Sequence, residues 1–197
     1  SLISKQLVYP CFEDPEELNL KRKAQLSSGK PPIYDRKSLN LTDQEIDEKI
    51  SKGKKPHYRF FLKNEKIIWN DLVRGECSLN TSSISDPIIL REDGRFIYTL
   101  ASVIDDSNFD ITHIIRGEDH VTNSAVQIQI FKALNSNIPK MGHLSLMTDI
   151  DGGGLSKRIG SLSINELKKQ NIEPQALTCY LAKIGSSQNV ELHNSMK

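Results

Sequence analysis

The chain has 197 residues, of which 37% are hydrophobic and 26% are charged, the balance of a soluble globular protein that buries a core without staples. The formal net charge is +1, so a nucleic-acid or membrane partner would need a local charged patch, and no apolar run is long enough to cross a bilayer. Three widely spaced cysteines without a CxxC pair argue against a disulfide framework and a structural zinc site, and they indicate a reducing compartment.

Two helices are predicted near the N-terminus. Residues 14–26 carry Pro15 where a first turn accepts it, and acidic residues precede basic ones, which complements the helix dipole. Residues 42–53 begin with Thr42 and Glu45 in capping-box spacing. Both patterns are strong local signals for the start of a helix.

Strand patterns follow. Residues 57–62 and 66–72 predict two strands around a turn, which indicates a hairpin. The rest of the chain alternates strand and helix, as a parallel α/β sheet does, and we place a domain boundary near residue 86. The later predicted elements are strands at 87–90, 96–100, 111–115 and 143–147, and helices at 124–134, 163–170 and 174–184.

The stretch DGGGLSKRIGS, residues 151–161, combines glycines with two cations. Glycines permit positive φ, and the positive charges of Lys157 and Arg158 suit phosphate. A helix start at Ser163 would add positive potential. The pattern is not a Walker loop, and it fits either a solvated turn or a loop that closes on phosphate.

The stretch IIRGEDHVTN, residues 114–123, places polar groups after a buried strand, where open α/β sheets bind ligands. Arg116 could hold a carboxylate through two parallel hydrogen bonds. The alternative is an internal salt bridge from Arg116 to Glu118 or Asp119. Thr122 is a possible N-cap of the next helix.

The stretch FIYTLASVIDD, residues 96–106, contains one hydroxyl in an apolar segment. Tyr98 is either a ligand contact or a core tyrosine with a satisfied hydroxyl. Asp105 and Asp106 resemble a metal pair, although adjacent acids more often cap or solvate a turn. Three lone histidines receive a structural interpretation and no other role: His57, His113 and His143.

Taken in order, Y-x-L-A-x-V-x-D-D, THIIRGEDH, a buried HL strand and LSKR make the chain closely similar to bacterial-type glutamyl-tRNA synthetases, a class I family. The upstream segment from YPCF to IYD resembles that family's acceptor-binding insertion. The resemblance implies an α/β fold. Residues 1–85 would form the tRNA acceptor-binding insertion, and residues 86–197 the C-terminal half of a Rossmann-like catalytic domain.

The resemblance also implies an activity. The family activates glutamate with ATP and Mg²⁺ and transfers it to the 3′ end of tRNA. LSKR matches the mobile second signature loop, KMSKS or KLSKR, whose cations stabilise charge on the phosphates during adenylate formation. Gly154 stands where the family has the first loop lysine, which removes one cation from the loop.

Site residues are carried over by position. Lys157 matches the catalytic lysine, and Arg116 matches the arginine that grips the substrate carboxylate. Glutamate binding is expected from Tyr98, Arg116 and His120. ATP binding is expected from Ser156, Lys157, Arg158 and Asp119.

Several absences shape the remaining expectations. The family's HIGH-like first signature would lie before Ser1, and the anticodon-binding domain would lie after Lys197, so the 197 residues are expected to be inactive alone. Some relatives carry a cysteine-rich zinc site where this chain has only Cys11, so no zinc is expected. The expected partners are tRNA, L-glutamate and ATP, with no membrane. The full-length protein is expected to be a cytoplasmic monomer.

Two other functions remain open. One is a related synthetase, which would act on glutamine, glutamylate tRNA(Gln) or modify a tRNA base. The other is a non-catalytic module that binds the tRNA acceptor stem through basic residues. Its candidate phosphate contacts are Lys52, Lys54, Lys55 and Arg59.

Overall fold

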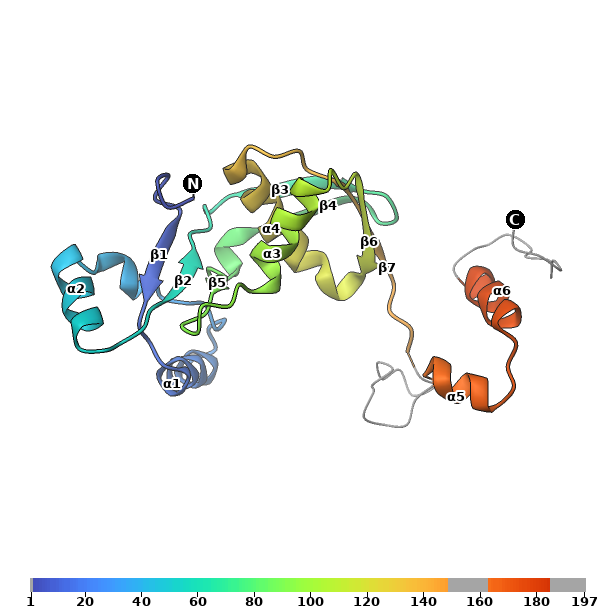
Figure 1. Cartoon of the computed structure of the whole chain (residues 1–197), viewed down its shortest axis with the longest axis horizontal. Coiled ribbons are helices and arrows are strands. Elements are labelled where there is room, and N and C mark those ends of the chain that lie inside the picture. The colour runs from blue at the N-terminus through green and yellow to red at the C-terminus, as the bar shows by residue number, and fades with distance from the viewer. Residues whose placement is uncertain (1, 149–162, 185–197) are drawn as a thin grey trace. The chain divides into compact units, whose positions relative to one another are not determined.

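The computed structural model of the chain describes residues 2–148 and 163–184. The chain divides into two compact units, Ser1–Ser145 and Leu146–Lys197 (Figure 1). In chain order, the helices and strands are β1 (Val8–Cys11), α1 (Pro15–Ser27), η1 (Lys37–Asn40), α2 (Asp43–Ser51), β2 (His57–Phe60), β3 (Lys66–Asp71), β4 (Gly75–Asn80), η2 (Thr81–Ser83), β5 (Ile88–Leu90), α3 (Tyr98–Asn108), β6 (His113–Gly117), η3 (Glu118–His120), α4 (Val121–Leu134), β7 (Lys140–Leu144), α5 (Ile164–Lys169) and α6 (Pro174–Ile184).

The two predicted N-terminal helices are confirmed. Pro15 is the first residue of α1, and the carboxylate of Asp14 accepts a hydrogen bond from the Glu17 N–H at 2.8 Å. In α2 the capping box is complete, because Thr42 and Glu45 each accept from the other's backbone N–H. Such caps satisfy N–H groups that have no partner within the helix.

The predicted hairpin of residues 57–62 and 66–72 is wrong, although both strands exist. β2 is the middle strand of an antiparallel sheet with β1 and β5, whereas β3 pairs with β4, which was not predicted. The turn at 63–65 serves other partners. The Lys63 N–H donates to Gln129 in α4, and the Glu65 N–H donates to Thr81 in η2, so the backbone of the turn bonds to these two elements instead of closing a hairpin.

The predicted strand at 96–100 is also wrong. Only Phe96 makes a strand-like bridge, to Leu90, and α3 begins at Tyr98. Leu100 and Val103, three residues apart, are the buried residues of this helix. A spacing of three places both side chains on one helical face, so packing against the core overrides the β-forming aromatic and branched residues.

The α/β expectation for the second half is confirmed by β6, α4 and β7. β6 and β7 are parallel neighbours, with Arg116 opposite His143, and α4 makes the connection between them. Thr122 is not the N-cap of α4, because η3 comes first and His120 occupies the cap position.

The hydrophobic core of the first unit is continuous across the predicted boundary near residue 86. Phe60, Leu62 and Ile67 belong to the same buried cluster as Val103 and Phe131. The division into an insertion (1–85) and a catalytic half (86–197) therefore stays a prediction about the family's architecture. In the first unit, residues on both sides of this boundary contribute to one core.

The described part of the second unit consists of α5 and α6, both as predicted. The Ser163 hydroxyl accepts from the Glu166 N–H at 3.2 Å at the start of α5. The loop at 151–161 lies outside the described residues. Within residues 2–148 and 163–184, no helix is both long and apolar enough to cross a membrane.

Candidate active site

Three residues expected to bind glutamate come together in the first unit. Tyr98 begins α3, Arg116 lies in β6, and His120 ends η3. The Arg116 Nη1 donates a hydrogen bond to the Tyr98 hydroxyl at 3.0 Å. The rings of Tyr98 and His120 lie 5.8 Å apart between centroids. Residues from three successive elements thus form one polar cluster after the end of β6.

Arg116 is held on its inner side by α4. Its Nη2 donates to Ser124 and to Gln127, both at 2.6 Å, and its buried Nε–H has no hydrogen-bond partner among the described residues. Glu118, one of the two residues considered for an internal salt bridge with Arg116, forms an ion pair with Arg74. The guanidinium is therefore fixed by hydrogen bonds to neutral acceptors.

Tyr98 is not a core tyrosine. It is 51% exposed, while its hydroxyl is satisfied by Arg116. A phenol that is bound on one side and open on the other can orient a small polar ligand beside the guanidinium.

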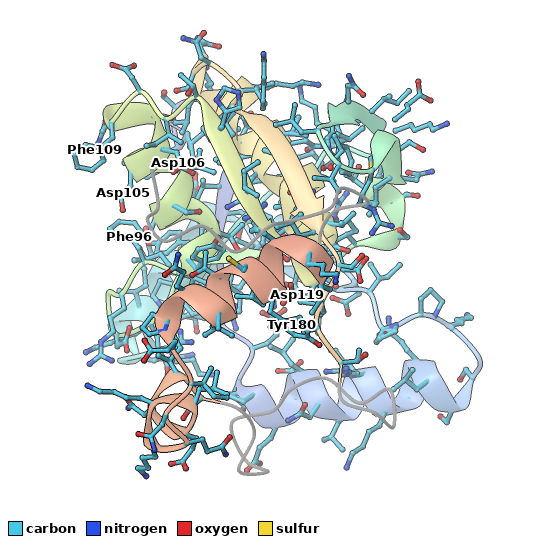
Figure 2. The ribbon with its side chains drawn as sticks, turned by 90° about the vertical axis from the view of Figure 1, so that its right-hand side faces the viewer. Phe96, Asp105, Asp106, Phe109, Asp119 and Tyr180 are labelled. Carbon is cyan, nitrogen blue, oxygen red and sulfur yellow. The ribbon has the colours of Figure 1, made fainter. Side chains whose placement is uncertain are left out.

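Asp105 and Asp106 lie towards the C-terminal end of α3, with Phe109 following them (Figure 2). They belong to the helix and not to a turn. Burial raises the pKa of Asp106 above its usual value, although the positive charge of Arg116 opposes that rise. Neither residue belongs to a three-ligand group in the described parts of the chain, so the structure gives the metal-pair interpretation no support.

The ATP-binding expectations are only partly within the described residues. Asp119 lies in η3 with its Oδ2 3.8 Å from the His120 Nε2, and more than half of its side chain is exposed. It therefore borders the Tyr98–Arg116–His120 cluster and is open to a ligand. Ser156, Lys157, Arg158 and Gly154 lie outside the described residues, so their roles stay predictions.

Among the described residues, one group of side chains is spaced closely enough to hold a metal ion. Ligand atoms of Cys11, Glu13 and His57 lie within 4.8 Å of one another. Burial raises the pKa of the Cys11 thiol, although hydrogen bonds with Tyr34 and Ser38 oppose that rise. Zinc requires the thiolate, so this environment disfavours it. The expected absence of zinc stays a prediction.

The basic residues proposed as phosphate contacts do not form one exposed patch. Arg59 is buried, its guanidinium stacks on the Tyr34 ring at 4.0 Å, and it donates to the Asp86 backbone carbonyl. Its interpretation as a phosphate contact is therefore wrong. Lys52, the C-cap residue of α2, forms an ion pair with Glu48 four positions earlier, which is typical of a solvated helical surface.

A buried hydrogen-bond network behind Arg116 was missed. His143 is confirmed as a structural histidine, and it links Ser124 to Asp71. His143 and Asp71 lie 72 residues apart in the sequence. Only the parallel register that sets Arg116 opposite His143 brings this network behind the arginine, and the sequence carries no local signal of it.

Comparisons with known proteins show what the chain is similar to. Residues 1–196 match the family model described as tRNA synthetases class I (E and Q), catalytic domain. The chain is 52% identical over 191 residues to Glutamate–tRNA ligase 2 of Hyphomonas neptunium, covering 97% of this chain and 43% of that protein. It is 50% identical over 197 residues to Glutamate–tRNA ligase 1 of Rickettsia massiliae, covering 100% of this chain and 44% of that protein.

A solved structure is similar as well. The glutamate tRNA ligase of Elizabethkingia meningosepticum, in complex with its amino acid, matches with a TM-score of 0.71 and 30% sequence identity. The match covers 81% of this chain and 34% of that chain. The chain thus spans less than half the length of the relatives that it matches.

Proposed function

Because the chain belongs to the family of class I tRNA synthetases of the E and Q type, we propose that it supplies part of the catalytic domain of a glutamate–tRNA ligase. In this proposal the complete enzyme activates L-glutamate with ATP to glutamyl-adenylate and then transfers the glutamyl group to tRNA. Support comes from two relatives that carry the name glutamate–tRNA ligase and are 52% and 50% identical to this chain over the aligned residues.

The observation that carries the proposal is the fixed guanidinium of Arg116 beside the half-exposed Tyr98. Arg116 binds the carboxylate of the bound glutamate, while the Tyr98 hydroxyl and the His120 ring border the same ligand. A carboxylate matches the fork of the guanidinium in charge and geometry. Glutamine has an amide in place of the side-chain carboxylate and would leave the cation without a counter-charge, so it is rejected.

The ATP side of the site is proposed from the sequence. Lys157, with Ser156 and Arg158, binds the phosphates and stabilises the charge that develops on the leaving pyrophosphate, and Asp119 lies toward the nucleotide. Mg²⁺ enters with ATP and shields the phosphates. Gly154 removes one cation from the loop, so the remaining cations carry this stabilisation.

The other partners follow from the same proposal. Residues 1–85 bind the tRNA acceptor stem, and the enzyme works as a cytoplasmic monomer. The choice between tRNA(Glu), tRNA(Gln) and a modified tRNA base is tested by charging each tRNA separately.

The test is ATP–pyrophosphate exchange with glutamate and tRNA. It is run on the 197-residue chain and on a longer protein in which a relative such as the Rickettsia massiliae ligase supplies the residues outside the match. We expect exchange only in the longer protein. Arg116→Ala should raise the KM for glutamate, and Lys157→Ala should lower kcat. If neither protein showed glutamate-dependent exchange, the result would contradict the proposal and favour a binding module.

A further inference from the structure

We propose that Asp71, His143 and Ser124 form a buried hydrogen-bonded relay that fixes the Arg116 guanidinium for a carboxylate ligand. The three are positioning residues, because none of them belongs to the exposed Tyr98–Arg116–His120 cluster. Their placement of Arg116 stands on geometry alone, whereas its importance for glutamate rests on the proposed function.

The relay runs through three secondary-structure elements. Asp71 is the last residue of β3, and its Oδ2 lies 2.5 Å from the His143 Nδ1. The His143 Nε2 lies 2.8 Å from the Ser124 Oγ in α4, which in turn accepts from the Arg116 Nη2 at 2.6 Å. The side chains of Asp71 and His143 are fully buried, and Ser124 is 0% exposed. Solvent therefore offers no alternative partner to these groups.

The carboxylate sets the direction of the hydrogen bonds. The Asp71 Oδ1 accepts from the backbone N–H groups of Val73, Arg74 and His143, which anchors the side chain and stabilises its negative charge. A charged Asp71 requires a donor at the His143 Nδ1, so in a neutral imidazole the Nε2 is the acceptor. The Ser124 hydroxyl then donates to the His143 Nε2 at 2.8 Å in preference to the more distant His120 carbonyl at 3.3 Å, and it turns a lone pair toward Arg116.

A second arm completes the placement. The Gln127 side-chain oxygen accepts from the same Nη2 at 2.6 Å, and the Gln127 Nε2 donates to the Ser102 hydroxyl at 2.6 Å. Both Nη2 hydrogens are therefore used by buried acceptors on α4. This leaves the guanidinium one orientation, with Nη1 at Tyr98.

The same residue types form the catalytic triad of serine hydrolases, but this arrangement does not suit that chemistry. A nucleophilic serine must reach a substrate carbonyl. The Ser124 Oγ is fully buried and is already in hydrogen-bonding contact with Arg116 and His143. Here the serine of the Asp–His–Ser series accepts a hydrogen bond from the proposed ligand-binding arginine and does not face a substrate carbonyl.

The first test is independent of any activity. Nuclear magnetic resonance of the 197-residue chain with nitrogen-15-labelled arginine reports rotation about the Arg116 Nε–Cζ bond. This rotation exchanges the positions of Nη1 and Nη2. We expect two separate Nη signals in the parent, and exchange-broadened or merged signals in Ser124→Ala and Gln127→Leu. Separate, unchanged signals in both variants would overturn the relay.

A matched control lies two residues away on the same helix. Gln129 is buried like Gln127, but its side chain bonds to Lys63 and Thr81 and not to Arg116. Gln129→Leu therefore removes a buried amide of the same size, and we expect it to leave the Arg116 signals unchanged. Ser124→Thr keeps the hydroxyl, so we expect it to show the two separate Nη signals of the parent, unlike Ser124→Ala. If Gln129→Leu merged the signals as Gln127→Leu does, general loosening of α4 would replace the relay as the explanation.

The second test measures glutamate use in the longer protein described above. Ser124→Ala should raise the KM for glutamate about tenfold, the size expected for misplacing one charged hydrogen bond, and leave the KM for ATP unchanged. In an Arg116→Ala background the same substitution should have no further effect, because it acts only through the arginine. Additive effects of the two substitutions would overturn the relay even if the enzyme uses glutamate.

The two proposals fail in different ways. A longer protein without glutamate-dependent exchange but with restricted Arg116 rotation refutes the proposed function and supports the relay as a device for placing the cation. An active enzyme whose Arg116 rotates equally in the parent and in Ser124→Ala refutes the relay and supports the function.

Discussion

Removing the Asp86 carboxylate should strongly destabilise the first unit. Asp86 precedes β5, and its side chain is fully buried. It accepts hydrogen bonds from the Tyr9 hydroxyl at 2.6 Å, the Arg36 Nη2 at 2.8 Å and the Leu62 N–H at 3.0 Å. One carboxylate therefore ties together three segments that are distant in sequence.

The size of the effect follows from these three donors. A buried donor left without a partner costs ~1–3 kcal/mol. The Leu62 N–H and the Tyr9 hydroxyl are buried and carry the full penalty, whereas Arg36 is a quarter exposed and is partly resolvated. We therefore expect Asp86→Ala to lower the free energy of unfolding by about 4 kcal/mol, within the range for breaking a buried charged pair.

Urea unfolding followed by the fluorescence of Trp69, the single tryptophan, measures the loss. With a slope of about 2 kcal/mol per M, the midpoint should fall by about 2 M. Asp47→Ala, on the exposed face of α2, is the control and should change stability by less than about 0.5 kcal/mol. An Asp86→Ala loss as small as that of the control would refute the reasoning.

Two further predictions concern Asp71 and Cys11. Burial raises the pKa of Asp71, but hydrogen bonds from the His143 side chain and three backbone N–H groups outweigh it and hold the pKa well below its usual range. Its stabilising contribution is therefore present above the unfolded pKa of about 4 and is lost as the pH falls toward the folded value. Asp71→Asn should therefore weaken the fall in the free energy of unfolding that the parent shows on acidification. An unchanged fall at acidic pH would contradict this assignment. Elemental analysis should find no stoichiometric zinc, because the buried Cys11 thiol resists ionisation; zinc that is present at one per chain and lost in Cys11→Ser would show the opposite.

Elements with local signals could be predicted from the sequence. The α1 and α2 helices start at side chains that cap their own backbone, and α6 begins at Pro174. Capping depends on residues three positions apart, so the information lies within one turn. The family resemblance likewise rests on short ordered motifs.

Elements defined by distant contacts could not be predicted. β4 alternates half-buried Cys77 and Leu79 with exposed polar residues, but two apolar positions are too short a pattern to predict a strand without its pairing with β3. Residues 96–100 are apolar and β-forming, but the core takes Leu100 and Val103 from a helix. In the site, the motifs pointed to Tyr98, Arg116 and His120, whereas the partners that fix Arg116 are set by the parallel pairing of β6 and β7.

The burial of α4 has a consequence for how this protein can vary. Eight consecutive residues of the helix, Ser124–Phe131, are buried, so the segment has no solvent face. An ordinary surface helix alternates tolerant and intolerant positions with its turn. Here the acceptable substitutions are limited at every position, by volume on the sides that meet the core and by hydrogen bonding where Ser124, Gln127 and Gln129 lie. We therefore expect few substitutions at every position of this segment. Its substitution rate would lack the helical period by which helices are usually recognised among diverging sequences.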